Sequence, residues 1–332
     1  MPTLIDFRRR IRSVQNTQKI TRAMKLVSAA KLRRAQDRVV NARPFAGQML
    51  EVLRSLAQRV EARQPGLSEV EGHPLLEVRP EETVLVLLLS GDKGLCGPFN
   101  TNVIRLAEHF LAAHPAERDH EPQLITIGKK GRDYFRRRRQ TLLAEHVNLF
   151  LRLVEYGQAK EIAAEVIRLY TEKRVDAVYL IYNEFKSILV QRLVREKLLP
   201  IEGVLPTRVV GGAAVPGQEA YDRSGGAVTP PAPSHAEGSK VEGRTATEID
   251  YLYEQPPAEL FDRLLPRHVE TQVYRALLES AAAEHAARMT AMDAATNNAA
   301  EMIERLTLYM NKVRQAQITK ELIEIVSGAA AL

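Results

Sequence analysis

Two stretches of apolar residues in heptad spacing, one near each end of the 332-residue chain, constrain its fold more than any other feature. Apolar residues that alternate three and four positions apart on a long helix are typical of a coiled-coil seam. The N-terminal series consists of Leu4, Phe7, Ile11, Val14, Leu32, Ala35, Val39, Ala42, Ala46, Met49, Leu53, Leu56 and Val60. The C-terminal series consists of Met289, Met292, Thr296, Ala299, Ile303, Leu306, Met310, Val313 and Gln317. We therefore predict two long terminal helices, within residues 1–65 and 256–332, that pair as an antiparallel coiled coil. The N-terminal register weakens at Gln18 and Thr21.

Residues 80–200 have a different pattern, in which apolar strands alternate with amphipathic helices. The predicted strands are Thr83–Leu89, Gln123–Ile127 and Asp176–Tyr182, and the predicted helices are Asn102–Ala113, a short one after Gly131 and Tyr156–Thr171. Strands that alternate with helices indicate a βαβ arrangement with a mostly parallel sheet. The expected fold class is therefore α/β plus coiled coil: a small Rossmann-like domain inserted between two long terminal helices.

Residues 203–247 lose all periodicity and are rich in Gly and Pro. A segment without an apolar face cannot bury enough surface to offset the entropy lost on ordering. We expect a flexible surface loop.

The charge is concentrated near the N-terminus, although the net charge of the whole chain is only +6. Between residues 8 and 38 Asp37 is the only acidic residue, and the basic residues are Arg8, Arg9, Arg10, Arg12, Lys19, Arg22, Lys25, Lys31, Arg33, Arg34 and Arg38. Such a block favours an acidic partner, which could be a nucleic acid, an anionic membrane surface or the acidic loops of a protein.

Composition excludes several classes of protein. The single cysteine, Cys96, cannot form an intrachain disulfide, and no stretch approaches the roughly 20 apolar residues of a membrane span. We expect a soluble, intracellular chain without direct membrane insertion. The histidines have no metal-ligand spacing, so no metal site is expected.

A glycine-rich turn, Ser90–Gly97, follows the first predicted strand at the place where a phosphate loop would lie. Its glycines have the spacing G-x-x-G-x-x-G, which fits neither a P-loop nor a dinucleotide-binding loop. We therefore expect a structural turn and no bound cofactor, and we expect Cys96 to be a small buried side chain.

The last eight residues, Ile325–Leu332, carry no charged side chain. A terminus without charge indicates that something encloses it, and a smooth apolar end could turn in an apolar sleeve.

Three blocks of sequence closely resemble the γ subunits of F-type ATP synthases, and the resemblance covers nearly the whole chain outside the 203–247 loop. The first block is Ile11–Gln36 and the second is Ser90–Asn102. The third consists of two parts, Ala281–Met292 and Arg314–Ala329. The resemblance implies a non-catalytic central shaft that couples proton flow to ATP synthesis or hydrolysis. It implies as partners the α and β subunits of the catalytic head, the ε subunit and the c-ring, and a peripheral location on the cytoplasmic face of the bacterial plasma membrane.

The resemblance also implies particular contact residues. Arg314 and Gln315 match residues that engage a catch loop of the β subunit, and Thr319 and Glu324 fall in a region used for coupling. The positions that match the contact with an acidic β-subunit loop are Arg8, Arg9, Met24 and Lys25. The 203–247 loop lies where the photosynthetic γ subunits carry a regulatory insertion with a cysteine pair, but it contains no cysteine.

Two other readings remain from the residues alone. A coiled-coil nucleic-acid-binding protein would use the basic helix to contact phosphates. An enzyme would require a nucleotide to bind at Gly91–Gly97.

Overall fold

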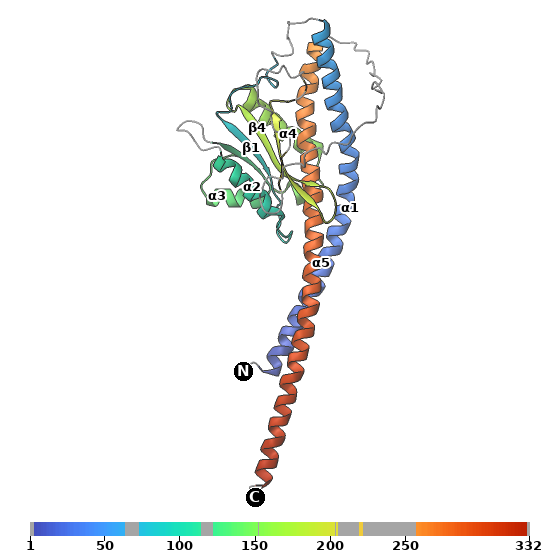
Figure 1. The fold of residues 1–332 in the computed structure, drawn as a ribbon, viewed down its shortest axis with the longest axis vertical. Coiled ribbons are helices and arrows are strands. Elements are labelled where there is room, and N and C mark those ends of the chain that lie inside the picture. Colours follow the sequence, from blue (N-terminus) through green and yellow to red (C-terminus); the bar gives the residue numbers. More distant parts are fainter. Residues whose placement is uncertain are drawn as a thin grey trace, which may run out of the picture. The chain divides into compact units, whose positions relative to one another are not determined.

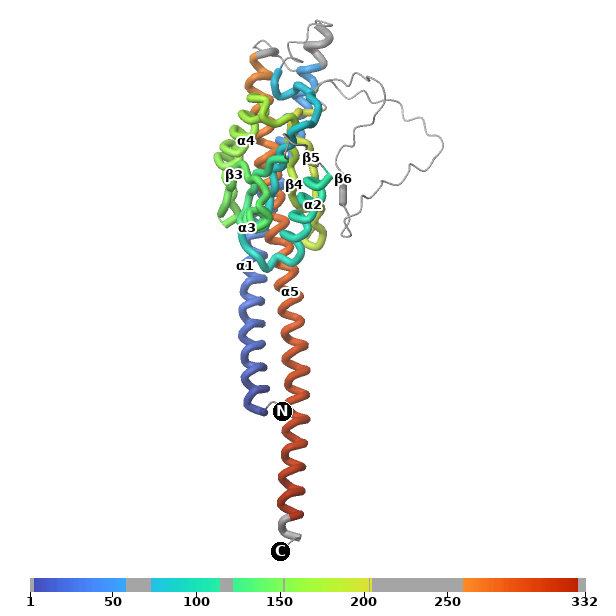
Figure 2. The backbone as a smooth tube through the Cα atoms, turned by 90° about the vertical axis from the view of Figure 1, so that its left-hand side faces the viewer, coloured from blue at the N-terminus to red at the C-terminus, as the bar shows by residue number. Residues whose placement is uncertain are grey.

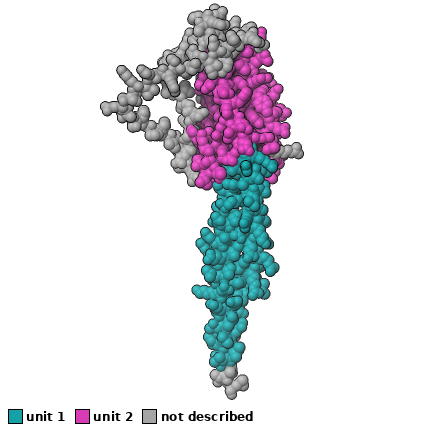
Figure 3. Space-filling view, turned by 90° about the vertical axis from the view of Figure 1, so that its right-hand side faces the viewer, with its two compact units in different colours: residues 1–34, 95–97, 284–332 teal, residues 35–94, 98–283 magenta. Residues whose placement is uncertain are grey.

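The computed structural model describes residues 3–63, 73–113, 122–151, 153–202, 204, 219–221 and 257–330. The chain divides into two compact units (Figure 3). Unit 1 comprises residues 1–34, 95–97 and 284–332, and unit 2 comprises residues 35–94 and 98–283. Helices α1 (Leu4–Arg63) and α5 (Pro257–Ala330) contribute residues to both units.

Unit 1 is an antiparallel pair of helices, as predicted (Figures 1 and 2). Phe7 of α1 stacks on Tyr309 of α5 with ring centroids 5.1 Å apart, and Thr21 of α1 meets Thr296 of α5 with their hydroxyl oxygens 2.8 Å apart. Residue numbers therefore rise along one helix as they fall along the other. Within α1, the predicted seam positions from Leu4 to Leu56 are buried or half-buried, while most residues between them are exposed. The seam also continues through Gln18 and Thr21, where the apolar pattern weakens, because polar side chains fill these positions.

Unit 2 is built on a mixed sheet whose strand order is β3-β2-β1-β4-β5-β6. The strands are β1 (Val84–Leu89), β2 (Gln123–Ile127), β3 (Leu142–His146), β4 (Ala177–Phe185), β5 (Gln191–Leu199) and β6 (Glu219–Tyr221). The first four in this order pair in parallel, which confirms the parallel arrangement and the three predicted strands. The parallel strand β3 and the antiparallel strands β5 and β6 were not predicted, and in β5 the charged residues break the apolar pattern of a strand.

The two faces of this sheet are covered by different elements. Helices α2 (Phe99–Ala113) and α3 (Lys129–Arg137) pack through Phe110 and Phe135 against alternate residues of β1, which are Val84, Val86 and Leu88. Ile181 of β4 packs in the same apolar cluster as Phe110 and Phe135. Because side chains alternate across a strand, its neighbour Tyr182 points to the opposite face of the sheet. Helix α4 (Tyr156–Thr171) and α5 contact the sheet away from α2.

Within unit 2, α5 is enclosed on all sides. Every residue from Ala276 to Ala283 is buried. The reason is that Glu279 of α5 contacts α1 through Arg43 and the sheet through Phe185, so α5 runs between them. A helix surrounded in this way needs small side chains, and the run of alanines at 281–283 provides them.

The predicted flexible loop, residues 203–247, lies almost entirely outside the described residues. The exceptions are Val204 and the short strand β6, which pairs with β5 at Leu193–Arg195.

Candidate partner-contact surfaces

All the contact residues predicted from the resemblance lie in unit 1. Helix α1 begins next to Thr3, whose backbone amide and hydroxyl both donate hydrogen bonds to the Asp6 carboxylate, at 2.9 and 2.8 Å. These hydrogen bonds lower the pKa of Asp6 below its usual value. A carboxylate in the first turn also opposes the partial positive charge of the helix N-terminus. The start of α1 is thereby fixed one turn before the basic block.

Arg8 and Arg9 are exposed in this helix, and within the described part of the chain neither forms an ion pair or a side-chain hydrogen bond. Met24 and Lys25 are half-buried beside the seam. Lys25 Nζ lies 2.6 Å from Asp293 Oδ1 of α5, with 39% and 47% of the two side chains exposed. The acidic residues of α5 therefore neutralise little of the basic block, and most of its charge faces outward.

The second group of predicted residues lies on the end of α5. Arg314, Gln315, Thr319 and Glu324 are all exposed. The Thr319 hydroxyl donates to the Gln315 carbonyl at 2.9 Å, and Lys320 pairs with Glu324 at 3.6 Å one turn along. Exposed pairs of this kind contribute little to stability. In the described residues no contact joins this group to the predicted residues of α1.

This end of α5 also exposes apolar side chains. Beyond its contact with Phe7, α5 continues from Tyr309 to Ala330, about 30 Å at 1.5 Å per residue. All described side chains from Arg314 to Ser327 are exposed, and the large apolar ones are Ile318, Leu322, Ile323, Ile325 and Val326. A contiguous apolar surface of this kind marks a site of interaction with another molecule.

The glycine-rich turn after β1 is closed at Ser90–Asp92, in unit 2, by contacts with the segments that follow β2 and β3. Asp92 accepts hydrogen bonds from the backbone amides of Lys129 at 3.0 Å, Asn148 at 2.8 Å and Phe150 at 3.1 Å. Lys129 is the first residue of α3, so the carboxylate of Asp92 occupies the helix N-terminus at which a phosphate would bind. The sequence analysis did not single out Asp92, because a carboxylate in a turn is ordinarily solvated.

Ser90 completes this closed turn. Its hydroxyl accepts from the Gly131 amide at 2.8 Å, and Gly128 has a φ of 97° at which a Cβ would overlap the Ser90 carbonyl oxygen. Gly128 and Gly131 therefore allow the start of α3 to approach the end of β1, and these glycines serve packing.

We also searched the described residues for a metal site, a reactive cysteine and a membrane-spanning helix. No group of three or more His, Cys, Asp or Glu side chains there is arranged to hold a metal ion. Cys96 is buried in unit 1, as predicted. Among the described helices, none has the length and apolar character needed to cross a membrane.

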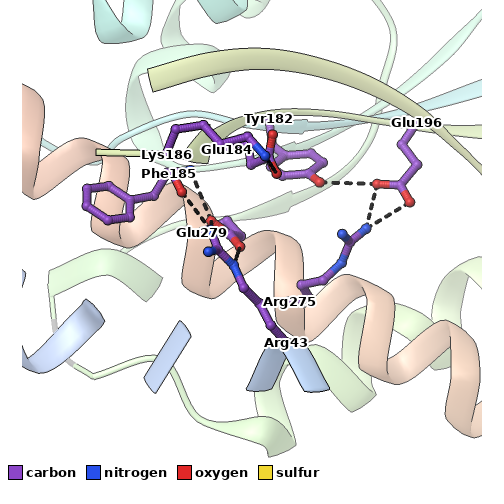
Figure 4. A network of polar contacts seen from close by, with 8 residues as sticks. All are labelled: Arg43, Tyr182, Glu184, Phe185, Lys186, Glu196, Arg275 and Glu279. Atoms are coloured by element: carbon purple, nitrogen blue, oxygen red, sulfur yellow. Dashed lines mark hydrogen bonds and ion pairs between the residues drawn. The ribbon is translucent and has the colours of Figure 1, made fainter. Parts of the chain in front are cut away.

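A partly buried polar network in unit 2 joins α1, α5 and the sheet (Figure 4). Glu279 accepts from Arg43 Nε at 2.8 Å and from the Phe185 amide at 3.0 Å, while an Arg43 terminal nitrogen donates to the Phe185 carbonyl at 2.6 Å. Four residues earlier on α5, Arg275 donates to both carboxylate oxygens of Glu196 on β5, at 2.8 and 2.6 Å. The Tyr182 hydroxyl donates to the same carboxylate at 3.1 Å.

The hydrogen bond to Glu279 raises the pKa of Arg43 further above its ordinary value. None of these residues was predicted as functional. One sequence signal was available: Arg275 and Glu279 are charged residues four apart in a stretch that is otherwise largely apolar.

Two histidines of α5 are buried as neutral groups. Burial, with the nearby charge of Arg275, lowers the pKa of His268 in unit 2 to about 4. Burial, with Arg288 and Lys31 nearby, lowers the pKa of His285 in unit 1 to about 4.

The two long helices form a coiled coil and contribute to a unit with a small Rossmann-like sheet, and α5 ends with exposed apolar side chains. These features are typical of a subunit that assembles with other chains. The comparisons with known proteins identify the family. A family model described as ATP synthase matches residues 3–332. The chain is 48% identical over 331 residues to the ATP synthase gamma chain of Solibacter usitatus (strain Ellin6076), covering 100% of this chain and 99% of that protein. It is 45% identical over 332 residues to the ATP synthase gamma chain of Pelotomaculum thermopropionicum, covering 100% of both. The chain belongs to the ATP synthase gamma chain family.

Solved structures agree on the fold. A chain of the Euglena gracilis mitochondrial ATP synthase, described as OSCP/F1/c-ring in rotational state 3, matches with a TM-score of 0.58 and 18% identity, covering 99% of this chain and 94% of that one. A chain of the Tetrahymena thermophila mitochondrial enzyme, described as central stalk/cring, matches with a TM-score of 0.55 and 23% identity, covering 83% and 99%.

Proposed function

We propose that this chain is the central shaft of a rotary ATP synthase and transmits torque between a membrane ring of c subunits and a catalytic head of α and β subunits. The end of α5 in unit 1 carries this proposal: it is helical and exposed on all sides from Arg314 to Ser327, and its exposed side chains include the large apolar ones of Ile318, Leu322, Ile323, Ile325 and Val326. Such an end is stable in water only at the cost of exposed apolar surface, and a sleeve of partner subunits removes that cost. Membership of the gamma chain family supports the same assignment.

Within this function, the charged surface of α1 contacts the head. Arg8 and Arg9 are exposed and unpaired in the described chain, and Met24 and Lys25 lie beside the seam. An acidic loop of the β subunit suits these cations, and it would meet each of the three β subunits in turn as the shaft rotates. Arg314 and Gln315 engage a second loop of β through exposed donors on α5, and Thr319 and Glu324 belong to the same coupling surface.

The chain itself performs no catalysis in this proposal, and ATP chemistry occurs in the head. Support comes from Asp92 in the turn after β1, which occupies the N-terminus of α3 and accepts hydrogen bonds from the backbone amides of Lys129, Asn148 and Phe150. The remaining partners are the c-ring, with which the Tetrahymena chain is described, and the ε subunit, which the resemblance to the family implies. The complex would place this chain on the cytoplasmic face of the bacterial plasma membrane as a peripheral subunit. Its segments would be a coiled-coil helix at 1–65, a globular domain at 80–200, a loop at 203–247 and a second coiled-coil helix at 256–332.

The test is to co-express this chain with the α and β subunits and to assay the purified complex for ATP hydrolysis. We expect a complex that contains one copy of this chain and hydrolyses ATP. A variant with Arg314→Ala and Gln315→Ala should assemble and turn over more slowly. Its matched control is Arg305→Ala, an exposed arginine of α5 outside the predicted set.

Failure of this chain to associate with α and β would contradict the proposal. An affinity for DNA or RNA that falls steeply with salt would then favour nucleic-acid binding by the basic block.

A further inference from the structure

The polar network of unit 2 has two parts, which we call the two pins. The first pin consists of Arg43, Glu279 and the backbone of Phe185; the second consists of Arg275, Glu196 and Tyr182. Residues four apart lie on one face of a helix, so Arg275 and Glu279 both point from α5 toward the β4–β5 hairpin (Figure 4). The pins thus connect one face of α5 to two adjacent strands, and the first pin also connects α5 to α1.

Apolar packing makes up most of the remaining burial of α5 in this unit, and the buried residues next to the pins include Ala276, Leu277, Leu278 and Ala281–Ala283. Two other polar contacts of α5 in this unit lie nearer the surface, a hydrogen bond from Tyr156 to Glu270 at 2.6 Å and an ion pair of His73 with Asp262 at 3.4 Å. Apolar burial is non-directional, so it holds the helix in place without specifying its angle about its own axis.

The pins, in contrast, are directional. Arg43 forks onto both oxygens of Glu279, at 2.8 and 3.0 Å, and the same carboxylate accepts from the Phe185 amide. Only 2% of the Glu279 side chain is exposed, against 42% of the Arg43 side chain, so the carboxylate end of this pin is shielded from water. Turning α5 against the sheet would break several charge-assisted hydrogen bonds at once.

We propose that the two pins fix the angle of α1 and α5 against the sheet of unit 2, so that torque applied to the sheet reaches the helices without slippage. This inference rests on the proposed shaft function. Arg43, Arg275, Glu196 and Glu279 are positioning residues in it, since they touch no nucleotide. They act on the coupling between hydrolysis and proton transport rather than on hydrolysis itself.

The experiment uses the complete membrane-bound complex and measures ATP hydrolysis and ATP-driven proton pumping on the same vesicles. In one variant Arg43→Met and Glu279→Met together replace the first pin with apolar side chains of similar length. Removing both charged partners avoids an unpaired buried charge and is often tolerated by the fold. We expect the complex to assemble and hydrolyse ATP, while the ratio of pumping to hydrolysis falls at least threefold.

A second variant, Arg43→Lys, keeps the charge and loses the fork, and it should reduce the same ratio by a smaller factor. The matched control carries Arg136→Met and Glu145→Met, which removes an ion pair of 2.8 Å in unit 2 that involves neither α1 nor α5. Its ratio should equal that of the unmodified complex. A merely structural role for the pins would lower the yield of complex and leave the ratio unchanged.

An unchanged ratio in the assembled double variant would overturn the proposal. If the double variant does not assemble, the Arg43→Lys variant provides the test, and an unchanged ratio of pumping to hydrolysis in that variant would also overturn the proposal. Failure of the shaft function itself is distinguishable, because the unmodified chain would then not enter the complex at all.

Discussion

Helix α5 meets two different environments in the two units. In unit 2 its residues Ala276–Ala283 are buried on every side and include the charged pin residue Glu279. In unit 1 its described residues from Arg314 onward are exposed on every side, although several of them are large and apolar. The buried part is rich in alanine and makes specific polar contacts, whereas the exposed part carries several large apolar side chains and a weak ion pair.

This difference shows that residue type alone does not decide the role of a helical segment. In unit 2 the chain supplies its own partners, and directional hydrogen bonds fix the geometry of α5. At the end of α5 in unit 1, the contacts would come from other subunits and would change as the shaft turns. A fixed register suits the first environment, and a smooth surface without strong pairs suits the second.

The largest expected effect on stability is at the first pin. Glu279→Ala would leave the Phe185 amide and the partly exposed Arg43 without their partner, and a buried polar group left without its hydrogen bond costs about 1–3 kcal/mol. Denaturant unfolding of the isolated chain, followed by circular dichroism, measures the change. A loss below about 1 kcal/mol would remove the contrast between the pinned and the exposed parts of α5.

The next effect is on pH dependence, and it involves one histidine in each unit. Both His268 and His285 have a pKa of about 4 when folded, against 6.5 as the ordinary value. Between these values the unfolded chain binds more protons, so stability present above pH 6.5 is lost as the pH falls toward 4. Across that window each histidine lowers the free energy of unfolding by about 1.4 kcal/mol per pH unit, or by about 3 kcal/mol per histidine between pH 6.5 and pH 4.

Denaturant unfolding at pH 7 and pH 5 tests this dependence. His268→Gln and His285→Gln should each flatten the profile by a similar amount. Unchanged profiles in both variants would mean that other groups dominate the acid sensitivity.

A smaller effect is expected at the ion pair of unit 1. Lys25 and Asp293 are both about two-fifths to one-half exposed, and pairs of this kind contribute at most about 1 kcal/mol. Asp293→Ala should therefore lower the free energy of unfolding by less than 1 kcal/mol, and high salt should reduce the difference further. A loss as large as that of Glu279→Ala would show that unit 1 is pinned like unit 2.

The smallest effect is expected at the end of α5. Ile323→Ser should change the stability of the isolated chain by less than about 0.5 kcal/mol, because the side chain is exposed. The same substitution in the complex should slow ATP hydrolysis, since partner subunits would enclose it. Equal hydrolysis rates would argue against an apolar sleeve at this position.

The backbone plan was predictable from the sequence, and the polar contacts were not. Heptad spacing predicted the seam through Leu32, Val39 and Ala46 because it depends on local periodicity. The strand β2 was predicted with its observed limits for the same reason. By contrast, Arg43 and Glu279 are 236 residues apart in sequence, and each resembles an ordinary charged residue of a helix until the fold brings them together. Asp92 shows the same limitation, since its partners follow different strands.

Rotation of this chain inside the assembled head is the most direct test of the account. Cys96 is buried and Arg137 of α3 is exposed, so Arg137→Cys offers a thiol in unit 2 to which a bead can be attached while the head is fixed to a surface. We predict that the bead turns in one direction when ATP is supplied and stops when ATP is removed. ATP hydrolysis by the same molecules with a stationary bead would contradict the claim that this chain is the rotating shaft.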